Sequence, residues 1–151
     1  MTPLVSMIEI ARPPEEVFSY VTDPSRFVNW QDNIVSGRMD GDHPRKVGAK
    51  CITIRRIGFA ERKITSEITE IDPPRSWAIR GIAGPIRAIV RVSVDPLQGS
   101  TGSRVTIALD FEGHGIGRLL VPLFVRRDAR NEMPMNMKRL KERLESPENA
   151  L

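Results

Sequence analysis

Apolar and polar residues alternate along most of the chain between residues 49 and 111, which is the pattern of half-buried β-strands. Turn sequences such as DPPR, AGP and DPLQGSTGS interrupt the alternation. The predicted strands are 51–57, 62–71, 76–82, 86–94 and 104–111. The connections are too short for crossover helices, so the pattern predicts an antiparallel sheet built of hairpins.

The last two of these strands have one clearly apolar side. On 86–94 and 104–111 that side carries Ile86, Ala88, Val90, Val92, Val94, Val105, Ile107, Leu109 and Phe111. The opposite sides carry mostly Arg, Ser, Thr, Asp and Glu, as in a sheet that faces water on one side. Another apolar element must therefore cover the apolar side of these strands.

The C-terminal segment supplies a cover, because its apolar residues recur at the spacing of one side of a long helix over 116–145. This stripe consists of Val125, Ala129, Met133, Met137, Leu140 and Leu144. Pro122 and Pro134 each remove a backbone donor, so we expect a kinked or ragged start. The first turns, LLVPLFV at 119–125, are apolar all round, which fits either a buried core segment or a functional surface patch.

The N-terminal part predicts one strand followed by two short helices. Apolar residues alternate at 4–10, where LVSMIEI favours a strand. In ARPPEEVFSYVTD, the prolines and the two glutamates suit the start of a helix. Asp23 then caps a second helix in DPSRFVNW, with Pro24 at its first position.

The charge pattern argues against nucleic acid as the partner. The net charge of +4 comes from residues 118–145, since the rest of the chain is balanced. No aromatic residues interleave with the basic cluster of Lys138, Arg139, Lys141 and Arg143, so it lacks a stacking platform for bases. We interpret the cluster as a solvated helix face.

Few residues are suited to bind a metal or a cofactor. One cysteine, Cys51, excludes an internal disulfide, and two histidines, His43 and His114, are too few for a structural zinc site. GHGIG at 113–117 follows an antiparallel series, so it lacks the βαβ context of a dinucleotide site. We expect no metal and no cofactor, and these glycines let the chain leave the sheet.

Length and hydropathy indicate a single cytoplasmic domain. The 151 residues suit one domain over 1–146, with a frayed tail at 147–151. No window approaches the length of a membrane span, and the N-terminus lacks the pattern of an export signal.

The order of these elements resembles the helix-grip fold of the START-like superfamily, and specifically its bacterial polyketide cyclase/dehydrase-type branch, often called SRPBCC proteins. The resemblance is carried by IARPPEEVFSYVTDPSRFVNW, TEIDPPRSWAIRG, GPIRAIVRVSVDPLQGSTGSRVT and MKRLKERLE, which start at residues 10, 69, 84 and 137. It implies an α+β fold in which a curved antiparallel sheet of about six or seven strands wraps around the C-terminal helix. It also implies an apolar cavity that takes a lipid, polyketide, sterol or other hydrophobic molecule.

The strand at 51–57 leaves open which of its sides faces this cavity. One side carries Cys51, Thr53 and Arg55, and the other carries two isoleucines and an arginine. If the first side faces inward, Arg55 can bind an anionic head group and Thr53 can donate to a carbonyl. An arginine on the outer side is the commoner arrangement.

Large aromatic, apolar and methionine side chains are the other candidates for contact with a ligand, since indoles offer flat apolar surface and methionines adapt their shape. Ordinary core packing explains the same residues. The full candidate set is Trp30, Thr53, Arg55, Trp77, Ile79, Val90, Val92, Ile107, Leu109, Phe111, Met133 and Met137.

We identify no catalytic residues. His114 is a conceivable base near the cavity mouth with Asp110 as its partner, but Asp110 belongs to the wet side of its strand and His114 to a glycine-rich turn. Cys51 lacks a neighbouring base and is interpreted as a buried small apolar residue.

Three functions remain open. The first is binding of a hydrophobic small molecule, and with it transport or processing, in a cavity between the sheet and the C-terminal helix. The second is a cyclase or dehydratase acting on a polyketide-like substrate. The third is an accessory role at an anionic membrane or a partner protein, with LLVPLFV as the docking patch. The sequence specifies neither the ligand nor the oligomeric state.

Overall fold

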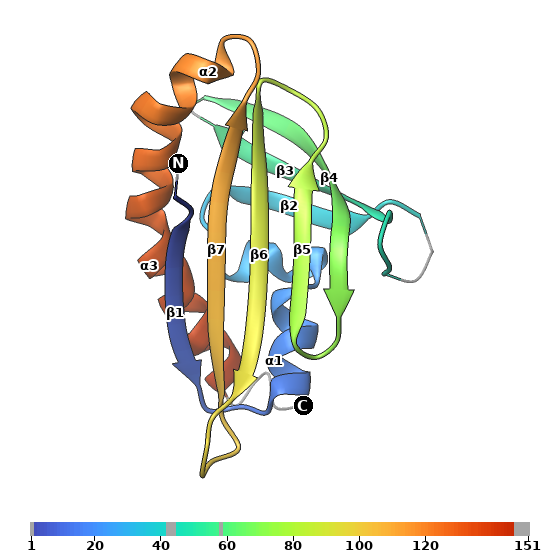
Figure 1. The fold of residues 1–151 in the computed structure, drawn as a ribbon, viewed down its shortest axis with the longest axis vertical. Coiled ribbons are helices and arrows are strands. Elements are labelled where there is room, and N and C mark those ends of the chain that lie inside the picture. Colours follow the sequence, from blue (N-terminus) through green and yellow to red (C-terminus); the bar gives the residue numbers. More distant parts are fainter. Residues whose placement is uncertain (1, 42–44, 58, 147–151) are drawn as a thin grey trace.

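A single antiparallel sheet dominates the computed structural model, which describes residues 2–41, 45–57 and 59–146 (Figure 1). Its seven strands lie in the order β1-β7-β6-β5-β4-β3-β2. Their bounds are β1 Leu4–Ile10, β2 Ile34–Met39, β3 Lys50–Ile57, β4 Ala60–Asp72, β5 Ser76–Gly81, β6 Ile86–Pro96 and β7 Ser103–Gly113. His43 and the expected tail at 147–151 lie outside the described residues.

The helices follow the predicted order. Helix α1 (Pro14–Val21) and the 3-10 helix η1 (Pro24–Asn29) come directly after β1. The chain ends in α2 (Gly117–Leu120), a π-helical turn η2 (Val121–Val125) and the long helix α3 (Arg126–Glu145), which runs beside β1 (Figure 1). The α+β helix-grip fold predicted from the sequence is thereby confirmed. No helix in the described part of the chain is long and apolar enough to cross a bilayer.

Strand β2 is the one strand that the sequence pattern missed. Its sequence, IVSGRM, mixes small, polar and apolar residues, and most of its side chains are exposed or half-buried. It forms one edge of the sheet and pairs only with β3. An edge strand that buries little surface does not need alternating apolar and polar residues, so the pattern does not mark it.

The predicted apolar side of the sheet forms the core together with the α3 stripe. Trp77, Val92 and Ile107 are direct neighbours across β5, β6 and β7, and all three are buried. From α3, Leu140 and Leu144 are 0% and 1% exposed and belong to the same cluster. The predicted packing of this helix on the sheet is therefore confirmed.

Burial on this side of the sheet falls toward the end that carries α2. Val94 and Val105 are 1% and 0% exposed. Farther along the same two strands, Val90, Leu109 and Phe111 are only half-buried. The concave side is thus sealed at one end and partly open at the other.

The segment LLVPLFV is not a core segment throughout. Val121 is buried, but Leu119, Leu123 and Phe124 are 66%, 60% and 56% exposed. Pro122 lies in the π-helical turn η2, where it lacks the backbone donor of a regular helix. The expected irregular start of the helix takes this form, whereas Pro134 stays inside α3.

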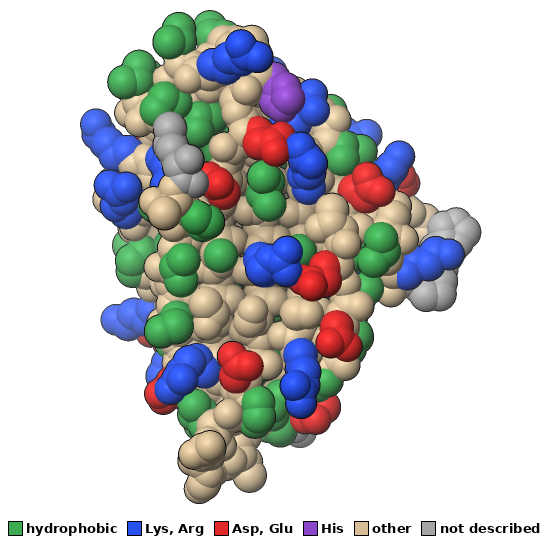
Figure 2. Space-filling model, in the orientation of Figure 1, with side chains coloured by type: hydrophobic (Ala, Val, Ile, Leu, Met, Phe, Trp, Pro, Cys, Tyr) green, Lys and Arg blue, Asp and Glu red, His purple; other side chains and the backbone are tan. Residues whose placement is uncertain are grey.

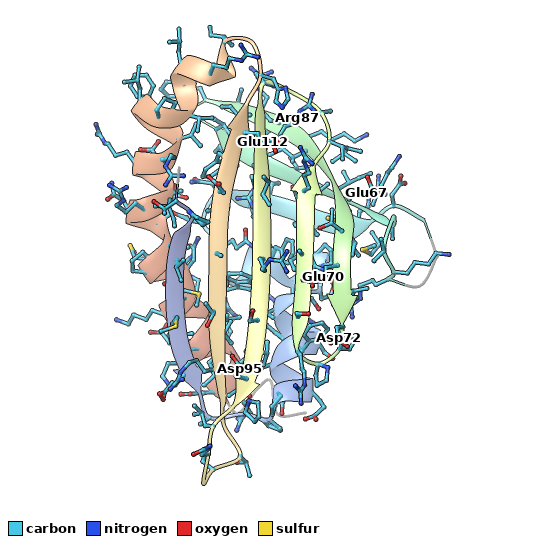
Figure 3. The ribbon with its side chains drawn as sticks, viewed as in Figure 1. Glu67, Glu70, Asp72, Arg87, Asp95 and Glu112 are labelled. Atoms are coloured by element: carbon cyan, nitrogen blue, oxygen red, sulfur yellow. The ribbon has the colours of Figure 1, made fainter. Side chains whose placement is uncertain are left out.

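The outer side of the sheet carries ion pairs that reach across an intervening strand, from β5 to β7 and from β6 to β4. Arg80 and Glu112 approach to 2.7 Å, and Arg91 pairs with Glu70. Both acidic residues are labelled in Figure 3, on the face turned to the viewer. This face is the wet side that the alternating pattern predicts.

We expect truncation of the buried stripe to destabilise the fold. Leu140→Ala removes a fully buried side chain and should lower the free energy of unfolding by about 2–5 kcal/mol, because it leaves a cavity. Met135→Ala, on the exposed side of the same helix, should change it by less than about 0.5 kcal/mol. Urea unfolding followed by circular dichroism measures both. Equal losses in the two variants would contradict the assigned packing of α3.

Candidate functional site

The side of β3 that carries Cys51, Thr53 and Arg55 faces the concave interior. Cys51 lies directly opposite Ser66 on β4, two residues before the core residue Ile68. Residues two apart on a strand share a side, so β3 shows this side to the core. The outward arrangement of Arg55, which is commoner for arginine, is therefore wrong for this chain.

Arg55 is the one charged group among the predicted site residues, and it is half-buried. Its Nη2 donates a hydrogen bond of 2.8 Å to Oε1 of Gln31. This is its one side-chain hydrogen bond among the described residues. The Glu132 carboxylate on α3 acts on it electrostatically, without an ion pair within 4.0 Å.

The segment after η1 holds this site together with α3. Asp32 N donates to Oδ1 of Asn136, and Nδ2 of Asn33 donates to Oε1 of Glu132, both over 3.0 Å. Together, Gln31, Asn33, Arg55 and Glu132 form what we call the polar cluster. It joins β3, the turn after η1 and α3 at the inner side of the sheet.

The η1 helix is fixed closely enough to hold the polar cluster in position. The Asp23 side chain accepts a hydrogen bond from Ser25 N at its first turn, as predicted for a cap. At Gly37 on β2, an added Cβ would overlap the carbonyl oxygen of Pro24. Glycine is required at Gly37 for this close approach, which holds the start of η1 against β2.

Burial and neighbouring charges shift the pKa values of the two ionisable groups in the cluster. Burial lowers the pKa of the Arg55 guanidinium, and the Glu132 carboxylate opposes this. Burial raises the pKa of Glu132, Asp32 and Asp128 raise it further, and Arg55 lowers it. An arginine stays charged at neutral pH even so, which leaves a cation at the edge of an apolar interior.

Two tryptophans form the aromatic part of the interior. The Phe27 ring packs edge-on against Trp30 and Trp77, with ring centroids 6.0 Å and 6.3 Å apart. The tryptophans are 5% and 2% exposed. Neither indole Nε1 has a hydrogen-bond partner among the described residues. Buried indole donors without partners are uncommon, and they can bind an acceptor that enters the interior.

The predicted ligand-contacting residues all lie on the concave side, at different depths. Thr53 is buried, Arg55 and Phe111 are half-buried, and Val90 and Leu109 pack half-buried against the core. The remaining seven belong to the buried cluster: Trp30, Trp77, Ile79, Val92, Ile107, Met133 and Met137. The structure therefore brings the set together, within a packed interior.

Two hollows in the described part of the chain lie elsewhere. One, of about 290 Å³, is lined by Met39, Asp40 and the segment 46–50. The other, of about 230 Å³, lies between Glu9 and Lys141 at the outer edge. Neither is lined by a predicted ligand-contacting residue.

Asp110 and His114 do not face each other. Asp110 Oδ1 accepts a hydrogen bond of 3.0 Å from Arg126. His114 Nε2 instead lies 3.5 Å from Glu112 Oε2. The thiol of Cys51 is 2% exposed, and burial raises its pKa to about 11. Such a thiol is mostly protonated at neutral pH and a poor nucleophile.

Sequence reasoning missed three members of the polar cluster. Gln31 and Asn33 lie in a polar turn after η1, where nothing in the pattern marks them. Glu132 directly precedes Met133 of the apolar stripe. A carboxylate at the margin of a buried stripe is a weak but readable signal for a group near the interior.

In the described part of the chain, no three His, Cys, Asp or Glu side chains group as metal ligands would.

Comparison with solved structures finds proteins of the same fold. A START superfamily protein from Mycobacterium smegmatis is 17% identical, with a TM-score of 0.76 over 96% of this chain and 98% of that one. The Zhui aromatase/cyclase from Streptomyces sp. R1128 is 11% identical, with a TM-score of 0.77 over 95% and 93%. TTHA0849 from Thermus thermophilus is 18% identical, with a TM-score of 0.72 over 94% and 96%. At these identities the likeness shows a shared fold.

Comparison at the level of sequence identifies the family. No curated protein matches the chain. The family model described as polyketide cyclase/dehydrase and lipid transport matches residues 1–145. Because this match spans nearly the whole chain and agrees with the helix-grip fold, the protein belongs to the polyketide cyclase/dehydrase and lipid transport family.

Proposed function

We propose that the protein binds a hydrophobic small molecule with an anionic head group on the concave side of the sheet. The apolar body of the ligand lies against the half-buried residues Val90, Leu109 and Phe111. Its head group lies at Arg55. The family description and the aromatase/cyclase among the similar structures support a lipid or a polyketide as the ligand class.

The observation that carries this proposal is the incomplete pairing of Arg55. A guanidinium offers five donors, and this one has a single neutral side-chain acceptor among the described residues, Gln31. Leaving a charge half-buried and poorly paired costs free energy. A carboxylate or phosphate held by two parallel hydrogen bonds would supply what the site lacks.

Binding requires the packed interior to open. Met133 and Met137 face the concave side from α3, and unbranched methionine side chains can change rotamer with little cost. Covering about 300 Å² of apolar ligand surface yields several kcal/mol at roughly 25 cal/mol per Å². Ordering costs reduce this gain, so we expect affinities near the micromolar range.

We expect Arg55 to determine the preference for an anionic head group. Oleate and oleyl alcohol share a hydrocarbon chain, and only oleate can pair with a guanidinium. Wild-type protein should bind oleate more tightly, whereas Arg55→Gln should lower oleate affinity by roughly 10- to 100-fold, the range of a charge-assisted hydrogen bond. Its affinity for oleyl alcohol should stay unchanged. Tryptophan fluorescence titration measures all four affinities.

Arg56→Gln is the matched control, because Arg56 is the next residue, lies on the outer side and pairs with Glu61 over 3.7 Å. It should bind oleate like wild type.

Native mass spectrometry of freshly purified protein tests the broader proposal by identifying any retained hydrophobic molecule. Absence of binding to both probes, with no molecule retained, would refute ligand binding.

A second candidate function is acid–base catalysis on a bound polyketide-like substrate. One observation favours it: Glu132 is a half-buried carboxyl whose pKa is raised by burial, and the cation of Arg55 acts on it. A carboxyl with a raised pKa can hold a proton closer to neutral pH and return it to a substrate. The sequence alone showed no such group.

We expect Arg55→Gln to raise the pKa of Glu132 further, because the cation that favours its carboxylate is removed. Carboxyl-carbon NMR titration measures this. Glu112, whose pKa is lowered mainly by its hydrogen bond from Arg80, should titrate as in wild type and serves as control. A Glu132 pKa at or below 4.5 in wild type would remove the support for catalysis.

The same shift fixes the sign of a stability change. A carboxyl whose pKa is raised by folding stabilises the fold in its protonated form. This contribution of Glu132 is present below its ordinary pKa of 4.5 and is lost as the pH rises through the higher folded-state pKa. The stability of wild type relative to Glu132→Gln should therefore fall over that pH window in urea unfolding.

A further inference from the structure

The start of the C-terminal helix presents a group of large apolar side chains to the surface. We call this group the apical patch, and its members are Ile116, Leu119, Leu123 and Phe124. Each is between 56% and 66% exposed. Figure 2 shows hydrophobic side chains gathered over this end of the molecule, with a basic side chain beside them. Exposed apolar groups of this kind mark interaction surfaces.

The apical patch is held in place from both sides. At Gly117, an added Cβ would overlap the carbonyl oxygen of Pro85, so α2 lies directly on the loop before β6. At the other end, Arg126 donates to Asp110 Oδ1 over 3.0 Å and to the Thr2 carbonyl over 2.6 Å. The patch is therefore a fixed feature of the folded surface.

The segment that carries the apical patch contains basic residues but no acidic ones. The chain carries no acidic residue from 113 to 127. Arg118 and Arg127 are exposed and have no ion pair among the described residues, whereas Arg126 is paired with Asp110. Arginines on this rim can keep their stems against the apolar surface while their guanidinium groups reach outward.

A second apolar and basic projection lies at the same end of the long axis. The hairpin between β3 and β4 turns there (Figure 1). Ile57 and Phe59 at its tip are 55% and 111% exposed. Arg62 and Lys63 follow on β4 and are exposed as well. Two segments far apart in sequence thus show the same combination of large apolar and basic side chains at one end.

We propose that this end of the molecule docks on an anionic lipid surface. The apical patch and the hairpin tip enter the boundary between head groups and acyl chains, and the exposed arginines and the lysine pair with lipid phosphates. Docking there brings the half-buried end of the concave side next to the membrane. The surface stands on its own residues and does not depend on which ligand the interior binds.

Vesicle co-sedimentation tests this proposal. Wild-type protein should bind vesicles of phosphatidylglycerol and phosphatidylcholine, and bind pure phosphatidylcholine vesicles much more weakly. Leu123→Ser with Phe124→Ser should lower binding by about tenfold or more, since the inserted apolar surface is removed. Arg118→Gln with Arg127→Gln should lower it by about fivefold for each charge and reduce its salt dependence.

The matched control is Val5→Ser with Met7→Ser. These two side chains are 60% and 61% exposed on the outer side of β1, so the change removes similar apolar exposure away from the apical patch. Binding of this variant should stay within about twofold of wild type. All variants alter exposed side chains, and circular dichroism verifies that each one folds.

Three outcomes overturn the proposal. One is wild-type protein that binds neither kind of vesicle, and another is an apical variant that binds like wild type. The third is concentration-dependent dimerisation that the apical variant abolishes, which would assign the surface to a second copy of the chain. The oleate titration, repeated on the apical variant, separates docking from ligand binding, because docking predicts unchanged oleate affinity in solution.

Discussion

Burial of one side of a single curled sheet is the constraint on which the other features depend. The strands are wet on their outer side, where arginine and glutamate pair across an intervening strand, so the stability of the fold depends on the inner side. Helix α3 covers that side with Met133, Met137, Leu140 and Leu144. The cover is complete near the end of α3 and incomplete near its start, and the candidate site lies where it is incomplete.

This gradient explains how a charged group can be tolerated beside the core. A guanidinium without a carboxylate in direct contact would be very costly in a fully dry interior. Arg55 lies instead where its neighbours are half-buried, and it is balanced by the amide of Gln31 and the more distant Glu132. The same partial hydration leaves Glu132 able to exchange its proton. The ionisable groups of Arg55 and Glu132 therefore lie beside apolar surface at one end of the sheet.

The sequence predicted the features that depend on repetition. Six of the seven strands and the long helix were predicted, because repetition in the sequence is visible without knowing the partners. The side of β3 that faces inward depends on its register with β4, and both of its sides mix apolar residues with arginine, so Arg55 could not be assigned. Glu132 approaches Arg55 through tertiary packing, which no local pattern encodes. The exposure of Leu123 and Phe124 is hidden for the same reason, since LLVPLFV is apolar in every direction.

The π-helical turn determines which way the apolar side chains at the start of the C-terminal helix point. Leu119 lies about four turns before Met133, so in an unbroken α-helix, which advances about 100° per residue, it would point to the same side as Met133. The turn at Val121–Val125 holds one extra residue and changes the rotational phase of everything before it. Leu119 consequently points outward while Val121 is buried. The one extra residue in the turn that contains Pro122 therefore determines whether the apolar side chains before it face the protein or the solvent.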